Sequence, residues 1–173
     1  MGVIYEQSIK DKSLPTVQVF GIPAPSTTQG YALGTLLFDE NTGTHYKYVK
    51  ATGSIAANEN TSYADATGYV VSQAPATAAG VGARAGVAPQ AFTTGQYGFI
   101  AVHGPITVNA TSTGYVLGDP VAPDVGAAGK VIEHTVTGGG ATVAEVTRAA
   151  AVMGFALQAE SGGTVKIFLN RCL

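Results

Sequence analysis

Charged side chains are scarce in this chain of 173 residues. They make up 12% of the sequence, about half of the roughly 25% typical of soluble proteins. Nine basic and eleven acidic residues give a formal net charge of -2. A nucleic-acid-binding surface needs clustered lysine and arginine to neutralise phosphates. We therefore expect no nucleic-acid partner.

Long hydrophobic runs are also missing. The longest, residues 149–157, is much shorter than the about 20 residues of a membrane-spanning helix, so we expect no membrane partner. Glu6 and Lys10 lie where a secretory signal peptide needs an apolar stretch. This predicts synthesis without Sec export.

Cysteine is nearly absent: the sequence contains one, Cys172. Disulfides within the chain therefore cannot stabilise the fold. A catalytic thiol needs a histidine fixed beside it in a cleft, and a fraying chain end is a poor platform for one. We interpret Cys172 as an ordinary terminal residue.

Small and β-forming residues are what the chain has instead. Glycine contributes 23 residues, and the hydrophobic fraction of 46% contains few aromatics, at 8%. Short β-branched runs alternate with glycine-rich turns at about ten-residue spacing in the second half. The pattern predicts an all-β fold: a small antiparallel β-barrel or sandwich with an N-terminal extended arm and a β-hairpin. Strands do not alternate with helices, which excludes a Rossmann-type fold.

Residues 1–30 are expected to form the extended arm. Three prolines at positions 15, 23 and 25 prevent a continuous helix, and residues 21–30 are typical of a linker or a strap lying on a surface. An arm of this kind buries little within its own fold, so its apolar residues indicate a partner surface. The candidate partner-binding residues are Val17, Val19, Phe20 and Ile22.

The clearest local structure is a β-hairpin. Strand-like runs at Leu36–Phe38 and Thr44–Val49 flank a loop that ends at Gly43. Alternation places Tyr46 and Tyr48 on one face of the second run.

The rest of the chain is divided by turn signals. Residues 53–68 are expected to be a loop or insertion, residues 69–72 a strand and residues 74–91 an irregular or edge-like Ala/Gly-rich stretch. Further strands are expected at 96–102, 106–110, 115–122, 129–136, 151–158 and 164–170, with a turn at Gly104-Pro105 and one possible helical turn at 141–150. The predicted regions are the arm at 1–30, a hairpin and loop region at 31–92, and a C-terminal barrel at 93–173. A single core common to the last two regions is the alternative.

Each candidate motif for chemistry lacks a residue or a spacing that its function requires. The run Gly80–Gly86 has the wrong glycine spacing for a dinucleotide loop. The segment that starts at Asp39 resembles a calcium loop, but Lys50 replaces its final bidentate glutamate. The three histidines, His45, His103 and His134, have no partners at metal-ligand spacing. We expect no cofactor, no metal and no enzymatic activity.

Several aromatic residues lie in the expected strands, namely Tyr46, Tyr48, Tyr97, Phe99 and Tyr115. As strand residues they are expected to belong to the core. A sugar-stacking platform is the alternative.

Three segments carry a resemblance to a known family. They are GTLLFDENTGTHYKYVKATGSIAANE, GQYGFIAVHGPITVNATSTGYVLGDPVAPD and GFALQAESGGTVKIFLN. Their order, within residues 31–173, is similar to that of the capsid decoration proteins of tailed bacteriophages, also called cement or head-stabilising proteins. The arm and residues 74–91 fall outside the similar pattern.

The resemblance implies a structural virion protein, made late in the host cytoplasm, that binds the outer surface of an icosahedral capsid. Its partner would be the major capsid protein, whose subunits it would bridge, often as a homotrimer. It carries over no catalytic residues. The alternative is a receptor- or glycan-binding module of a phage head fibre or tail. A major shell subunit is a weaker hypothesis, because the sequence has no pattern for a long helix. An enzyme is the weakest hypothesis.

Overall fold

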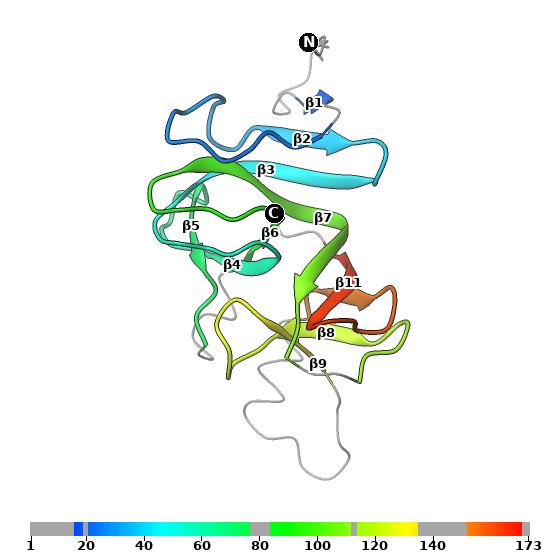
Figure 1. Ribbon diagram of the computed structural model, residues 1–173. Coiled ribbons are helices and arrows are strands. Elements are labelled where there is room, and N and C mark those ends of the chain that lie inside the picture. The colour runs from blue at the N-terminus through cyan, green and yellow to red at the C-terminus, as the bar shows by residue number, and fades with distance from the viewer. Residues whose placement is uncertain (1–15, 19–20, 77–83, 112–113, 135–151, 171–173) are drawn as a thin grey trace.

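The computed structural model describes residues 16–18, 21–76, 84–111, 114–134 and 152–170, and for residues 16–18 it describes the main chain alone. Every regular element within these residues is a β-strand (Figure 1). The predicted all-β class is therefore confirmed. No helix in the described part is long and apolar enough to span a membrane.

The strands are numbered along the chain. They are β1 (Thr16–Gln18), β2 (Leu36–Asp39), β3 (Thr44–Ala51), β4 (Glu59–Tyr63), β5 (Val70–Gln73), β6 (Arg84–Ala88), β7 (Tyr97–Asn109), β8 (Pro120–Pro123), β9 (Val131–Glu133), β10 (Gly154–Ala156) and β11 (Thr164–Leu169).

Five of these strands close into a barrel. The order β3–β5–β4–β6–β7 returns to β3 through an antiparallel β3–β7 pairing, so every strand of the ring has two neighbours. The pairings are antiparallel except between β3 and β5. Closure removes the open sheet edges that would otherwise expose unpaired main-chain groups.

The predicted hairpin is confirmed and lies beside the barrel. β2 pairs antiparallel with β3, with Leu37 opposite Tyr46 and Asp39 opposite Thr44. β1 adds to the outer edge of β2 in parallel register, with Val17 opposite Leu37. The sheet thus extends from the barrel toward the N-terminal segment at the top of Figure 1.

The long strand β7 connects the barrel to a second sheet. Its first half pairs with β3 and its second half with β11. The predicted turn at Gly104-Pro105 is wrong, because the strand continues through these residues. Gly104 bends it with a φ of +98°, and a Cβ there would lie 2.5 Å from the carbonyl oxygen of Gly43. Only glycine fits both requirements.

The second sheet has the order β7–β11–β10–β8–β9. A parallel bridge between Ala110 and Val131 brings β9 back to the end of β7. The main chain of Thr111 reinforces this return by donating to the Val131 carbonyl at 3.0 Å. The C-terminal strands therefore curl around a small core of their own.

Two sequence expectations about the middle of the chain are wrong. The expected loop at 53–68 contains β4, and the expected irregular stretch at 74–91 contains β6. β4 was not predicted because its residues are polar, yet Asn60, Thr61 and Ser62 are buried in the barrel wall. The Thr61 hydroxyl donates to the Gly86 carbonyl at 2.9 Å, which supplies a partner that the sequence alone does not reveal. The possible helical turn at 141–150 lies outside the described residues.

The other expected strands correspond to β5, β8, β9, β10 and β11, most of them shorter than predicted. The expected division at residue 92 falls just before β7, which belongs to the barrel and to the second sheet alike.

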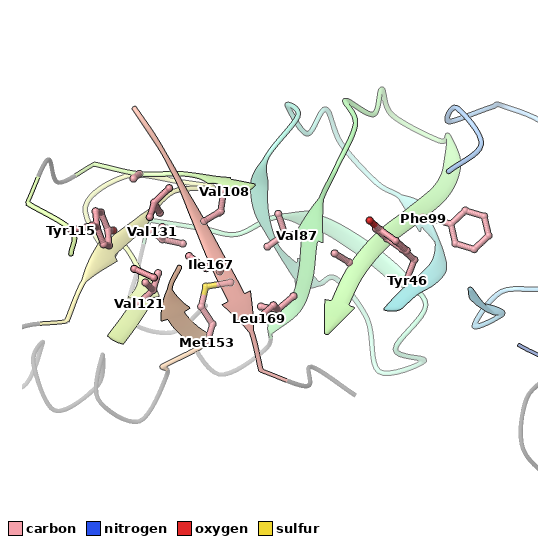
Figure 2. Close-up of a cluster of buried hydrophobic side chains, with 14 of the residues drawn as sticks. Tyr46, Val87, Phe99, Val108, Tyr115, Val121, Val131, Met153, Ile167 and Leu169 are labelled. Atoms are coloured by element: carbon pink, nitrogen blue, oxygen red, sulfur yellow. The ribbon is translucent and has the colours of Figure 1, made fainter. Parts of the chain in front are cut away.

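Two hydrophobic clusters hold the structure together. The smaller lies within the barrel and consists of Val49, Ala51, Ile55, Val71, Ala85, Ala88, Phe92, Ile100 and Val102. The larger runs from the core of the second sheet, around Ile167, to the rings of Tyr46 and Phe99 (Figure 2). Alternate residues of β7 serve different clusters, since Phe99 and Ala101 face the larger and Ile100 and Val102 the smaller.

Candidate functional site

The candidate arm residues lie at the edge of the described structure. Val17 belongs to β1, where only the main chain is described. Val19 and Phe20 lie outside the described residues. Ile22 is partly buried and packs against the larger hydrophobic cluster, and its carbonyl accepts a hydrogen bond from the Gln90 side chain at 3.3 Å. In this conformation Ile22 contacts its own chain.

Residues 21–30, here called the strap, lie across the outside of β3 and β7. Ser26 and Tyr97 exchange two main-chain hydrogen bonds, at 2.9 and 2.8 Å. Further along, the Gly30 main-chain N–H donates to the Tyr48 hydroxyl at 2.9 Å. Of the two sequence interpretations for this segment, linker or strap, the strap is confirmed.

Beneath the strap is a cavity of about 270 Å³. Four aromatic rings line it, from Tyr31, Tyr48, Tyr97 and Phe99, together with Pro23, Ala24, Ser26, Thr28, Gly30 and Gly98. The Tyr31 ring meets Tyr48 and Phe99 edge-on at centroid distances of 5.2 and 5.3 Å. The rings of Tyr48 and Tyr97 are nearly parallel, 6.3 Å apart. We call this site the tyrosine pocket.

A second feature is a set of exposed large hydrophobic side chains on the C-terminal strands and in the loop before β8. Its members are Val116, Leu117, Phe155, Leu157 and Phe168, which we call the apolar patch. Phe155 and Phe168 lie directly opposite each other on β10 and β11 and are 45% and 38% exposed. The Gly118 N–H donates to the Ala156 carbonyl, which holds the loop that carries Val116 and Leu117 next to β10.

A row of rings extends the apolar patch toward the hairpin. Phe168 contacts His103 edge-on at a centroid distance of 5.2 Å. His103 lies 5.5 Å from His45, which in turn lies 4.6 Å from Phe38. The row thus joins β11, β7, β3 and β2, and it is possible because β7 serves both sheets. The sequence did not predict that His45 and His103 belong to such a row of rings.

The described residues do not assemble a metal site. No three His, Cys, Asp or Glu side chains among them come together in a way that could hold a metal ion. The calcium-like segment has a structural role instead, because the Asp39 carboxylate accepts from the Asn41 N–H at 3.0 Å and the Thr42 hydroxyl at 2.9 Å. These bonds form the turn of the β2–β3 hairpin.

The five aromatic residues considered for a sugar platform are separated by the fold. Tyr48, Tyr97 and Phe99 line the tyrosine pocket. Tyr46, Tyr48, Phe99 and Tyr115 are all buried in the larger cluster, so the expectation that strand aromatics belong to the core is confirmed for these four; Tyr46 and Tyr115 have no part in the pocket lining. Burial raises the pKa of the Tyr46 hydroxyl, with a smaller opposing effect from its hydrogen bond with Thr44.

Sequence reasoning missed Tyr31 and the apolar patch. Tyr31 lies in a loop without strand periodicity, so no pattern connects it with Tyr48. Part of the patch could have been predicted from the alternation of side chains along β11. Val165, Ile167 and Leu169 are buried there, whereas Lys166 and Phe168 are exposed. A phenylalanine on the outward phase of a strand indicates an interaction surface.

The chain resembles known proteins in its structure and not in its sequence families. No family model matches the sequence, and no curated protein matches it. Among solved structures, the base of the head fiber protein gp8.5 of bacteriophage phi29 is similar, with a TM-score of 0.48 and 17% sequence identity. The similarity covers 73% of this chain and 93% of that chain.

Proposed function

We propose that this protein is a structural component of a tailed-phage virion that binds the outer surface of the icosahedral capsid. There it stabilises the shell by bridging major capsid protein subunits, as a homotrimer. It is made in the host cytoplasm before it joins the particle. It acts by binding, without catalysis and without a cofactor.

Two lines of reasoning support this proposal. The three segments named above resemble phage capsid decoration proteins, and the small β-barrel that this resemblance implies agrees with the observed fold class. A non-enzymatic role also agrees with the described surface, whose prominent features are aromatic and apolar.

The apolar patch is the observation that carries the proposal. Exposed hydrophobic clusters on soluble proteins mark interaction surfaces, and aromatic residues dominate the binding energy of protein interfaces. Phe155 and Phe168 lie side by side on regular strands, so the patch is held rigidly and needs little ordering on binding. It suits a protein that binds a repeating shell surface in many copies.

The double variant Phe155→Ser/Phe168→Ser tests the role of the patch. We expect the number of copies bound to purified particles to fall more than about tenfold, because truncating an interface hot spot costs about 2 kcal/mol or more. The measurement is quantitative mass spectrometry of particles, with shell protein as the internal standard. The isolated variant should still unfold cooperatively, with only a modest drop in its thermal midpoint, because both side chains lie outside the core and the loss is limited to their cross-strand contact and the contact of Phe168 with His103.

The matched control is Tyr97→Ser, which removes a half-buried aromatic ring from the other candidate site. Its occupancy on particles should stay at the wild-type level. Wild-type occupancy of the Phe155/Phe168 variant would contradict capsid attachment through the patch.

A further inference from the structure

The tyrosine pocket has no part in the proposed capsid binding, and its lining is mainly aromatic and apolar. Its floor consists of buried rings, since Tyr48 and Phe99 are 4% and 2% exposed. Its walls are the partly exposed rings of Tyr31 and Tyr97 on one side and the strap on the other. Ligand sites usually combine such an apolar lining with a few fixed polar groups.

The polar groups of the pocket are neutral hydroxyls. Three of the lining residues carry hydroxyl groups, namely Ser26 and Thr28 on the strap and Tyr48 on β3, and the Ser26 hydroxyl accepts a hydrogen bond from the Thr28 N–H at 3.1 Å. The Tyr48 oxygen accepts a hydrogen bond from the Gly30 N–H. Within the described part of the chain the Tyr48 proton has no acceptor, so this hydroxyl remains able to donate to a ligand.

Among the described residues, no charged side chain lines the pocket. The Lys50 ammonium lies over the Tyr97 ring at 5.4 Å from its centroid, but Lys50 is not among the residues that line the pocket. A phosphate, carboxylate or ammonium ligand would lose its hydration without gaining an opposite charge. The pocket therefore favours a neutral ligand.

From these features we propose that the tyrosine pocket binds a single neutral pyranose ring of a glycan. A pyranose has a C–H face that packs on aromatic rings and hydroxyl edges that exchange hydrogen bonds with serine, threonine and tyrosine. A volume of about 270 Å³ is at the small end of ligand pockets, which suits one ring. The strap's own Pro23 closes one side, so an extended proline-rich peptide, which needs a continuous groove, fits less well.

This inference is independent of the capsid-binding proposal, because the pocket and the apolar patch share no residue. It also differs from the sugar platform considered in the sequence. Tyr31 and the strap replace Tyr46 and Tyr115, which the fold buries.

Saturation-transfer-difference NMR on the full chain tests the proposal. The probes are the methyl glycosides of glucose, galactose and N-acetylglucosamine at millimolar concentration, with a proline-rich decapeptide as a fourth probe. We expect at least one glycoside to receive saturation, strongest on the protons of one C–H face. Tyr97→Ala should reduce this signal at least about fivefold, the change expected from loss of one stacking partner.

Three controls separate binding from folding. Tyr97→Phe keeps the ring and should restore most of the signal, and Phe155→Ser, in the apolar patch, should leave it unchanged. The thermal unfolding midpoint of each variant shows whether it is folded, and Thr28→Val offers a second test of the pocket at an exposed position. The proposal is overturned if no glycoside receives saturation, if the signal survives in folded Tyr97→Ala, or if the peptide alone binds.

Discussion

Gly86 shows how a single residue determines whether two strands can pair. Its φ of +150° lies in a region that side chains rarely adopt, and a Cβ at this position would overlap the carbonyl oxygen of Ala101. The obstacle is main chain on the neighbouring strand β7, so no side-chain rotation can relieve it. Glycine is required where two backbones approach this closely.

Gly86→Ala should therefore destabilise the barrel. We expect a loss of about 3 kcal/mol or more in the free energy of unfolding, because strain and a main-chain overlap add. Chemical denaturation monitored by circular dichroism gives the value. Gly53→Ala is the control, since nothing lies within 4 Å of a Cβ at Gly53; equal stability of the two variants would refute the explanation.

At the scale of elements, β1 and the strap attach the N-terminal segment to the rest of the chain. β1 lies outside the closed ring of five strands, paired only with β2. The barrel therefore keeps all its internal pairings without β1. An edge strand of this kind can pair equally well with a neighbouring molecule, because main-chain hydrogen bonds supply the affinity.

Deleting residues 1–20 should weaken binding to particles while the remaining domain still folds. The deletion removes β1 together with Val17, Val19 and Phe20, three of the four candidate arm residues, and leaves the barrel and the strap intact. Particle occupancy and the thermal unfolding midpoint are measured on the same preparation. Replacing Val17, Val19 and Phe20 by glycine keeps the chain length and isolates the side-chain contribution. Unchanged occupancy of the truncated protein would contradict a binding role for the arm.

At the scale of the whole molecule, two small β-structures are joined by the strand β7, by the larger hydrophobic cluster that extends through both, and by a few polar contacts. The Asn109 N–H donates to the Asn58 carbonyl at 2.7 Å, and the Asn60 N–H donates to the Gly129 carbonyl at 2.7 Å. These bonds tie the second sheet to the barrel. The patch and the pocket share no residue, so the two proposed activities would use separate surfaces of one copy.

The number of copies per particle separates the two roles that the sequence suggested. A decoration protein should be present on the order of hundreds of copies, near a simple ratio with the shell protein, because a symmetric shell repeats its binding sites. A few to a few tens of copies would favour the head-fibre or tail module. Quantitative mass spectrometry of purified particles measures the ratio, and absence from particles would contradict both.

The sequence alone determined the class of fold and the best local element. Turn residues and β-branched runs act over a few positions, so the hairpin Leu36–Phe38 with Thr44–Val49 and most C-terminal strands were predictable. The extended course of residues 21–30 was predictable too, because proline prevents a helix there, but only the contacts with Tyr97 and Tyr48 show that this segment is a strap and not a linker.

Only the tertiary structure decided the rest. β4 and β6 carry polar, alanine and glycine residues, and they become strands because the ring of neighbours satisfies their main-chain groups. The pair Gly104-Pro105 is a typical turn signal, but in the structure Gly104 contacts Gly43 closely and forms a bend within one long strand. Tyr31 joins Tyr48 and Phe155 joins Phe168 through contacts distant in the chain, and both candidate sites depend on such contacts. Local propensity contains no information about partners that the closing of a sheet supplies.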